Sequence, residues 1–540
     1  MPTKKLLSIT NLKKYFPVAK TSIFQRKQLY VRANEDISID IYEGETIGVV
    51  GESGCGKSTL GRVLLQLYPQ TAGSTMYYGK TLAEIAPEYV TDTLNHLDKY
   101  KAKLQKASQK TRELEAKVAE VGEDKADFYL LQDRNLARCE EITCLNNIVK
   151  ILGGFFAQDE NGQGRQLIKE LFQENAARNK VLDAYTDADV SIEHLEGPKA
   201  EDKPANAQQR LEQLKRKREE LSATLRAYDE KIAGYQKTLD ALRDKYADNE
   251  EFQKYEAMRD DGIDLARLKY AEMRILRKDL QIIFQDPYSS LNPRFTIGQI
   301  IEEGLTTHKF FKHGSEKMRD YIVETMEKCG LQEYMLHRYP HQFSGGQRQR
   351  ICIARALAVK PKFIVCDECV SALDVSIQSQ IINLLQELKE KENLTYMFIS
   401  HDLSVVRYIS DRICVMYLGN IVEFAEAKTI FEDPRHPYTV ALLSSVPSTD
   451  PDSLDKERIL LEGNIPSPIK PPDGCKFHTR CYMACDKCKR VPPELREIEP
   501  GHFLACHFPQ RKIDENGNYT FELPKMEKKS VRSSVAADGQ

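Results

Sequence analysis

The chain contains no tryptophan, and it has no run of eighteen apolar residues that could span a bilayer. Its first residues, MPTKKLLSITNLKKYF, lack an apolar signal core, so we expect no export. Neither sign of charge dominates: 78 Lys and Arg stand against 81 Asp and Glu, a formal net charge of −3. This balance gives no support to a nucleic-acid binder. Disulfides are also disfavoured, because thirteen cysteines in a long chain without a signal are typical of reduced thiols or metal ligands.

A length of 540 residues with a mean hydropathy of −0.51 predicts a soluble protein of about two to four structural units. Residues 1–82 and 271–445 both have short β-branched runs alternating with helical patterns, which predicts an α/β domain. Residues 83–270 are rich in Lys, Glu, Gln and Ala and have few strand signals. Residues 446–512 are rich in Pro, Cys and His, and we expect 513–540 to be a disordered polar tail.

Residues 83–270 carry two heptad patterns, which predict an inserted coiled coil. Two arms with a break between them predict one antiparallel hairpin, with residues near 128–200 at its tip. The alternative is a pair of amphipathic helices folded onto the main domain. The first pattern consists of Leu97, Tyr100, Leu104, Ala107, Thr111, Leu114, Val118 and Val121, and the second of Leu211, Leu214, Leu221, Leu225, Tyr228, Ile232, Tyr235, Leu239, Leu242 and Tyr246.

The run GESGCGKS at residues 51–58 follows the predicted strand ETIGVV and precedes a helical pattern. This is the G-x-x-x-x-G-K-[ST] phosphate-binding loop in the context that it requires. Its glycines let successive N–H groups point at one phosphate, and the helix N-terminus adds partial positive charge. Lys57 is expected to neutralise the β- and γ-phosphates, and the Ser58 hydroxyl to bind Mg²⁺.

A second acidic motif is the run KFIVCDE. Its apolar residues predict a buried strand that ends in Asp367 and Glu368. Ligands of open α/β sheets bind at the carboxyl ends of the strands. Asp367 is therefore a candidate for holding Mg²⁺ through water, and Glu368 for polarising the attacking water as general base.

Four further motifs select one class among nucleotide hydrolases. They are IIFQDP with Gln285, FSGGQ at 343–347, SALD at 371–374, and His401 after the run LTYMFIS. In this order they resemble the Q-loop, signature, D-loop and switch histidine of ATP-binding cassette (ABC) ATPases. The resemblance covers about 1–80 and 271–445 and implies a P-loop NTPase cassette.

The resemblance implies that two cassettes sandwich two ATP molecules, so that the signature residues contact the γ-phosphate held by the partner's P-loop. It implies catalytic roles for Glu368, His401 and Gln285, with Gln285 also near Mg²⁺, and an aromatic residue against adenine, for which Phe16 fits best and Tyr15 is the alternative. Cys369 stands where the family usually has Pro. The expected nucleotide-binding residues are Phe16, Gly51, Ser53, Gly54, Cys55, Gly56, Lys57, Ser58, Thr59, Ser344, Gly345, Gly346, Gln347 and Asp374.

Finer features look like the ATP-binding subunits of bacterial oligopeptide and dipeptide permeases. These features are GESGCGKSTLGR, IFQDPYSSLNPR, HQFSGGQRQRICIARAL, DPRHPYTVALL and GNIPSPIKPPDGCKFHTRC. The likeness implies a peripheral subunit on the cytoplasmic face of the cell membrane. It would pair with a second ABC ATPase subunit and two transmembrane permease subunits, and would receive peptide indirectly from an extracytoplasmic solute-binding protein. Importers of nickel, glutathione or other small solutes share the subfamily and remain an alternative.

The Pro-rich end carries Cys475, Cys481, Cys488 and Cys506, a spacing that suggests a tetrahedral metal site. The resemblance assigns these four positions to a [4Fe–4S] cluster. Cys485 completes the run CDKC, which keeps a zinc site open, and unmetallated thiols are a third reading. His478, His502 and His507 are more simply structural.

A different class, a soluble coiled-coil ABC ATPase that acts on DNA, is disfavoured. In those proteins the Q-loop precedes the coiled coil, whereas Gln285 follows the insertion here. A docking scaffold with inactive ATP sites is also disfavoured, because the Lys, Ser, Asp, Glu and His expected for hydrolysis are all present.

Overall fold

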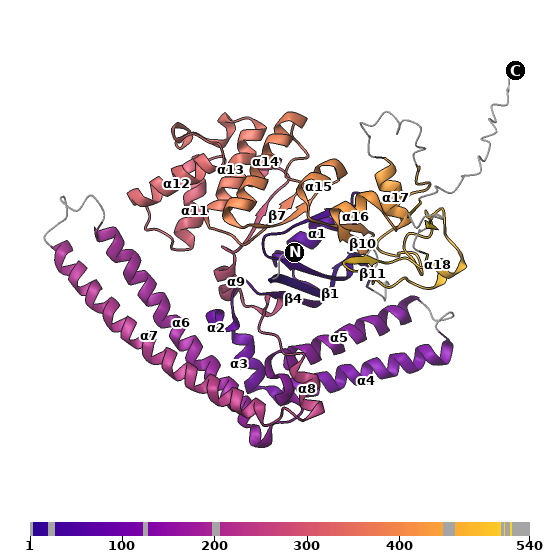
Figure 1. The fold of residues 1–540 in the computed structure, drawn as a ribbon, viewed down its shortest axis with the longest axis horizontal. Coiled ribbons are helices and arrows are strands. Elements are labelled where there is room, and N and C mark those ends of the chain that lie inside the picture. The colour runs from indigo at the N-terminus through magenta and orange to yellow at the C-terminus, as the bar shows by residue number, and fades with distance from the viewer. Residues whose placement is uncertain are drawn as a thin grey trace.

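The computed structural model describes residues 4–19, 28–122, 128–196, 206–445, 459–508, 512–513 and 519–520. Figure 1 shows an α/β body from which two helical hairpins extend. The predicted polar tail, 513–540, lies almost wholly outside the described residues, and only a two-residue ladder between β13 (Lys512–Ile513) and β14 (Tyr519–Thr520) belongs to that region.

The main sheet has eight strands in the order β11-β12-β10-β9-β3-β8-β7-β6. The strands β9, β3, β8, β7 and β6 run parallel, and β10, β12 and β11 extend the sheet in antiparallel fashion. Side chains of the central strands are buried on both faces, which is why their sequences read as continuous apolar runs. The strands are β3 (Thr46–Val50), β6 (Leu280–Ile283), β7 (Phe363–Asp367), β8 (Thr395–Ile399), β9 (Arg412–Tyr417), β10 (Asn420–Glu426), β11 (Arg496–Glu499) and β12 (His502–Leu504).

A second, antiparallel sheet of four strands has the order β2-β1-β4-β5. Its strands are β1 (Lys5–Pro17), β2 (Tyr30–Tyr42), β4 (Ala72–Tyr77) and β5 (Ile263–Asp264). Because β4 and β5 are neighbours, the chain leaves for the long insertion and returns at the same place in the sheet. The ends of the insertion are therefore already together, which keeps its entropic cost low.

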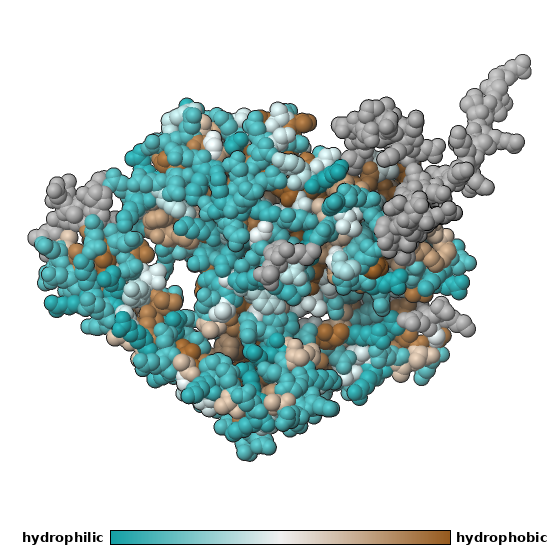
Figure 2. All heavy atoms as spheres, viewed as in Figure 1, coloured by the Kyte–Doolittle hydropathy of each residue, from teal (hydrophilic) through white to brown (hydrophobic). Residues whose placement is uncertain are grey.

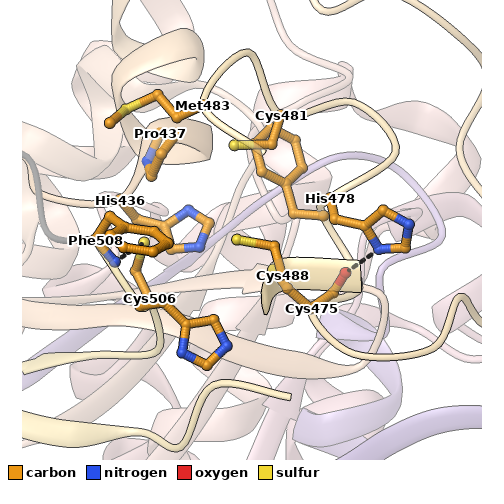
Figure 3. Close-up of a pocket in the computed structure, with 11 residues that line it drawn as sticks. His436, Pro437, Cys475, His478, Cys481, Met483, Cys488, Cys506 and Phe508 are labelled. Atoms are coloured by element: carbon orange, nitrogen blue, oxygen red, sulfur yellow. Dashed lines mark hydrogen bonds between the residues drawn. The ribbon is translucent and has the colours of Figure 1, made fainter. Parts of the chain in front are cut away.

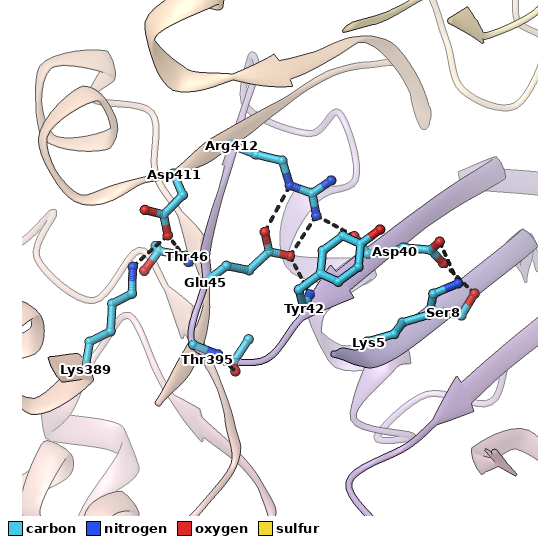
Figure 4. A network of polar contacts seen from close by, with 11 residues as sticks. Lys5, Ser8, Asp40, Tyr42, Glu45, Thr46, Lys389, Thr395, Asp411 and Arg412 are labelled. Carbon is cyan, nitrogen blue, oxygen red and sulfur yellow. Dashed lines mark hydrogen bonds and ion pairs between the residues drawn. The ribbon is translucent and has the colours of Figure 1, made fainter. Parts of the chain in front are cut away.

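A polar network joins the two sheets (Figure 4). The Arg412 guanidinium donates to both carboxylate oxygens of Glu45, at 2.9 and 2.7 Å, and to the carbonyl of Asp40 at 2.6 Å. Asp411 accepts the N–H of Thr46 at 2.7 Å and the ammonium of Lys389 at 2.6 Å. Bidentate Arg–carboxylate pairs fix orientation as well as distance, so the network sets the angle between the sheets.

Helices cover both faces of the main sheet and form a separate helical layer beside it (Figure 1). The predicted run RQRICIARALAV forms a helix that begins at the signature motif, as expected. The helices of the cassette are α1 (Lys57–Leu64), α9 (Tyr270–Leu276), α10 (Pro287–Ser290), α11 (Ile297–Thr307), α12 (Glu316–Lys328), α13 (Gly345–Ala358), α14 (Val375–Glu392), α15 (Leu403–Ile409), α16 (Ala427–Glu432), α17 (Pro437–Ser444) and α18 (Asp486–Arg490).

The insertion forms two hairpins, and the predicted single hairpin is wrong. Ion pairs such as Arg138–Glu115 at 2.6 Å join α4 to α5, while Arg178–Asp229 at 2.5 Å joins α6 to α7. The heptad patterns predicted which faces of the helices are apolar, but they could not predict which helix packs against each face. Any nearby amphipathic helix can cover such a face. The helices are α2 (Leu82–Ile85), α3 (Glu88–Asn95), α4 (Leu97–Val121), α5 (Phe128–Leu152), α6 (Gln163–Glu196), α7 (Asn206–Asp244) and α8 (Glu250–Glu256).

The base of the insertion is part of the body. Phe252 is fully buried, stacks on Tyr246 at 5.0 Å between ring centroids, and meets Phe155 edge-on at 5.3 Å. One apolar cluster joins these residues to the residues of β1, β2 and β3. The expected boundary between cassette and insertion near 83 and 270 therefore has no counterpart in the packing, because the core continues across it.

The distal part of the α6–α7 hairpin approaches the helical layer. Lys309 pairs with Asp187 at 2.9 Å, and Lys317 pairs with Glu193 at 3.3 Å. All four side chains are more than half exposed, so such pairs stabilise the arrangement little. Figure 2 shows hydrophilic side chains covering most of the visible surface of both hairpins. No helix in the described part of the chain is both long and apolar enough to cross a membrane.

The packing predicts that the distal hairpin is dispensable for folding, whereas its base is not. We expect replacement of residues 184–223 by a short Gly-containing turn to leave the midpoint of thermal unfolding of the rest nearly unchanged, because this part has few contacts with the body. By contrast, Phe252→Ala should cost about 3–5 kcal/mol through loss of burial and the cavity that it leaves. Circular dichroism and denaturant melts of both variants measure this, and an equal loss in the two would contradict the assignment.

Candidate functional site

The loop after β3 has the shape that the phosphate-binding motif predicts. Gly56 has a φ of 103°, and a Cβ there would lie 2.0 Å from the carbonyl oxygen of Ala33. At Gly51 a Cβ would lie 2.2 Å from the carbonyl oxygen of Met416. Both positions thus exclude any side chain, which explains the two outer glycines of the motif. Cys55 is buried behind the loop, and its carbonyl accepts the N–H of Gly419 at 2.9 Å.

Lys57 begins α1 and turns back into the loop. Its ammonium donates to the carbonyls of Gly51 at 2.7 Å and Glu52 at 3.2 Å. The side chain is only 5% exposed, so its charge is held inside the curl of the backbone. A buried cation beside a helix N-terminus attracts anions strongly, because both contribute positive potential at one point.

The two residues expected around Mg²⁺ lie together. The Ser58 hydroxyl donates to Oδ1 of Asp367 at 2.5 Å, although the residues are 309 positions apart. Oδ2 of Asp367 accepts from the Arg62 guanidinium at 3.3 Å. Hydroxyl and carboxylate oxygens are the donors that Mg²⁺ takes in nucleotide sites, so the pair fits this ion.

Glu368 lies at the centre of the remaining polar residues. Its Oε2 accepts from the Gln285 amide at 2.9 Å and lies 3.7 Å from Nδ1 of His401. Its φ of 49° is unusual for a residue with a side chain, and such strain costs on the order of 1–3 kcal/mol. The carboxylate at this position thus lies between the side chains of Gln285 and the switch histidine.

The signature residues form a separate helix terminus at the start of α13. The Ser344 hydroxyl accepts the N–H of Gln347 at 3.4 Å, and the Gln347 side chain accepts the N–H of Ser344 at 3.1 Å. This reciprocal cap leaves the first N–H groups of the helix available to an anion. Among the described contacts of Ser344 and Gln347, none reaches the P-loop of the same chain. Gly345 and Gly346 lie with them in the first turn, and Asp374 begins α14.

The two aromatic candidates for adenine differ in exposure. Tyr15 is 6% exposed, and its hydroxyl donates to Glu35 at 2.7 Å, so its ring belongs to the core of the antiparallel sheet. Phe16 is half-buried, with the ring of Tyr68 edge-on at 5.5 Å and the Lys14 ammonium 4.6 Å from its centroid. Phe16 is therefore the better placed of the two to stack on a base.

The four predicted cysteines line one pocket, although they come from separate turns (Figure 3). Cys475, Cys481, Cys488 and Cys506 face it together with Phe477, and Cys475 donates its N–H to the carbonyl of Cys488 at 2.8 Å. Burial raises the pKa of the Cys481 thiol to about 12 and that of Cys506 to about 11. A metal bound there has to displace protons from the thiols.

The positions of the cysteines have different consequences for the two metal sites considered, an iron–sulfur cluster and a single zinc ion. Sγ of Cys485 lies 3.8 Å from Sγ of Cys488, but Cys485 does not line the pocket. Within the described ranges, no three His, Cys, Asp or Glu side chains are placed to hold a single metal ion. A cubane cluster spreads its four thiolate ligands around a larger body than one zinc ion does. The four cysteines share one pocket, but the described side chains do not meet the geometry that a single metal ion requires. Of the three histidines named from the sequence, His478 and His507 line the pocket, whereas His502 bonds to Glu423 at 2.9 Å.

Several contacts of the site were absent from the sequence expectations. Arg62 bonds to Asp367, and the P-loop residue Glu52 is bound by Tyr438 and Arg480 from the C-terminal region. Arg480 directly precedes Cys481, so the sequence does place a cation next to a predicted metal ligand, and this could have marked Arg480 as a candidate functional residue. Nothing in the sequence indicated that it reaches residue 52.

Comparison with known proteins agrees with this geometry. A family model for ABC transporters matches residues 34–225 and 247–371, more than half of the chain. The chain belongs to the ABC transporter family. It is accordingly an ABC ATPase with the cassette fold, and its nucleotide is ATP, taken with Mg²⁺. A model described as the oligopeptide/dipeptide transporter C-terminal region matches residues 422–488.

Curated relatives cover the cassette. The chain is 53% identical over 248 residues to the putative oligopeptide transport ATP-binding protein YkfD of Bacillus subtilis, which is 46% of this chain and 75% of that protein. It is 52% identical over 248 residues to AppF of the same organism, with the same shares. With OppF of Salmonella typhimurium it shares 53% identity over 246 residues, 45% of this chain and 73% of that protein.

The position of Glu368 leads to a prediction about ATP hydrolysis. We expect Glu368→Gln to bind ATP but to hydrolyse it at least about a hundredfold more slowly, since the amide cannot accept a proton from water. Lys57→Ala serves as the contrast, because it should lose ATP binding itself. Phosphate release at saturating ATP, with nucleotide binding measured on the same preparations, tests both. Near-normal turnover by Glu368→Gln would refute the assignment of the base.

Proposed function

We propose that this chain is the ATP-hydrolysing subunit of a bacterial importer of oligopeptides or dipeptides, bound peripherally at the cytoplasmic face of the cell membrane. The C-terminal region carries this proposal. Residues 422–488 match the peptide-transporter region, and the relatives that are 52–53% identical to this chain over 246–248 residues are named for peptide transport. Strand β10 lies at the start of this region, and β12, which follows the region in the chain, pairs with β10, so the region is joined to the main sheet.

In the proposed reaction, Lys57 and the N–H groups of the P-loop bind the β- and γ-phosphates. Ser58 and Asp367 hold Mg²⁺, which screens the charge of the phosphates when it is bound. Glu368 accepts a proton from the attacking water, and Gln285 orients the Glu368 carboxylate and the water. His401 stabilises the phosphoryl group during transfer. Ser53, Gly54, Thr59 and Phe16 complete the contacts with the nucleotide.

The proposed ATP site is composite. Ser344 and Gln347 cap the start of α13, and their described contacts do not reach the P-loop of this chain. The first N–H groups of this helix would therefore contact ATP held by a second ABC ATPase subunit. Asp374, the last residue of the SALD motif, would lie at the same interface. Two transmembrane permease subunits complete the transporter, and a solute-binding protein outside the cell delivers peptide to them. This chain provides no nucleic-acid site in the proposal.

The partners are tested by affinity purification of the tagged full chain from native membranes. We expect a second cassette and two polytopic permeases to co-purify, and the reconstituted complex to take up labelled peptide only with ATP. The Glu368→Gln complex is the matched control. Uptake of nickel or glutathione, but not of peptide, would show that the proposed substrate is wrong. Co-purification of chromosomal DNA would overturn the proposal in favour of a DNA-acting ATPase.

We further propose that Cys475, Cys481, Cys488 and Cys506 hold a [4Fe–4S] cluster, supported by their shared pocket. We expect the anaerobically purified chain to be brown, with visible absorbance that is lost in Cys481→Ser. Cys485→Ser, whose thiol lies outside the pocket, should keep the colour. Metal analysis provides the alternative outcome: colourless anaerobic protein with one zinc per chain, or with no metal, would remove the cluster.

A further inference from the structure

A charged pair joins the cysteine-bearing loop to the P-loop. The Arg480 guanidinium donates to both oxygens of the Glu52 carboxylate, at 2.6 and 2.9 Å. The Arg480 side chain is 6% exposed and that of Glu52 25% exposed, so water screens the pair little. The Arg480–Glu52 pair is bidentate and partly buried, and ion pairs of this kind are among the stronger ones. The two residues are 428 positions apart.

Glu52 transmits this contact into the phosphate site. Its N–H donates to the Tyr438 hydroxyl at 2.8 Å, so the C-terminal region holds both its backbone and its side chain. Its carbonyl, on the other side, accepts from the Lys57 ammonium at 3.2 Å and from the N–H of Cys55 at 3.2 Å. A shift of Glu52 therefore moves groups that receive the phosphates.

The segment that carries Arg480 is itself fixed. Phe477 is fully buried and packs edge-on against Tyr417 and Tyr438, with centroids 5.2 and 5.3 Å away. Lys476 donates to Glu35 at 2.9 Å. Burial raises the pKa of the Glu35 carboxyl, but Lys476 and neighbouring cations more than offset this and hold that pKa at about 2.

Charge gives a second reason for the pair. Without Arg480, the Glu52 carboxylate would be an uncompensated negative charge within the phosphate-binding loop. Repulsion between like charges is strong where water is excluded. Arg480 removes that repulsion without contacting the nucleotide itself.

We propose that Arg480 is a positioning residue for ATP binding, which acts through Glu52 to hold the first turn of the P-loop. The cysteine-bearing loop thereby contributes to nucleotide affinity. This inference rests on the proposed role of the P-loop in binding the phosphates.

The test measures binding of a non-hydrolysable ATP analogue with Mg²⁺ to the full chain. We expect Arg480→Ala to weaken binding about tenfold, in the range usual for coupled sites, and to raise KM for ATP more than it lowers kcat. Arg480→Lys, which keeps the charge but not the paired geometry, should recover part of the affinity. The matched control is Lys489→Ala, which breaks an exposed ion pair with Asp486 in the same region and should bind like the parent.

A double-mutant cycle separates positioning from simple destabilisation. The double variant Arg480→Ala with Glu52→Gln should bind no more weakly than Arg480→Ala alone, because the two residues act as one unit. If Arg480→Ala does not fold, Glu52→Gln alone still breaks the pair and should weaken binding. Parent-like affinity in these variants, with only a lower melting temperature, would overturn the inference, as would additive losses in the cycle. Failure of the parent itself to bind would instead refute the proposed ATP site.

Discussion

The whole site depends on the parallel alignment of β3, β8 and β7. Their carboxyl ends meet at one edge of the sheet, so the residues that follow each strand arrive together: the P-loop after β3, Asp367 and Glu368 at the end of β7, and His401 after β8. Register fixes this meeting, because Val49 and Asp367 both pair with Ile399. The contact between Ser58 and Asp367 is its direct result.

The insertion shows how a cassette accommodates a long segment without losing that alignment. Its chain leaves from β4 and returns through β5, the neighbouring strand of the smaller sheet, and not from the sheet that contains β3, β7 and β8. The base has become part of the apolar core through Phe155 and Phe252. The distal parts of the two hairpins project, and that of α6–α7 approaches the helical layer through exposed ion pairs such as Lys309 with Asp187.

The C-terminal region joins the cassette in two ways. Strand β12 pairs with β10 and extends the main sheet. In the cysteine-bearing segment, Arg480 binds the P-loop residue Glu52, and Lys476 binds Glu35 of the second antiparallel sheet. Both cations are adjacent to a cysteine of the shared pocket. Arg480 and Tyr438 thus connect the P-loop directly to the region that contains the cysteine pocket.

The sequence by itself determined the local chemistry. The P-loop, the acidic strand end and the capped signature helix each depend on residues that are close along the chain, so their patterns sufficed to predict them, and the exposure of Phe16 agrees with the preference for it over Tyr15. Tertiary structure alone decided what covers each apolar stripe: the heptads of α4 and α7 predicted buried faces, but packing paired them with α5 and α6. It also decided that Arg480 meets Glu52, because a contact across 428 positions is set by the folding of every element between them and leaves no periodic trace in the sequence.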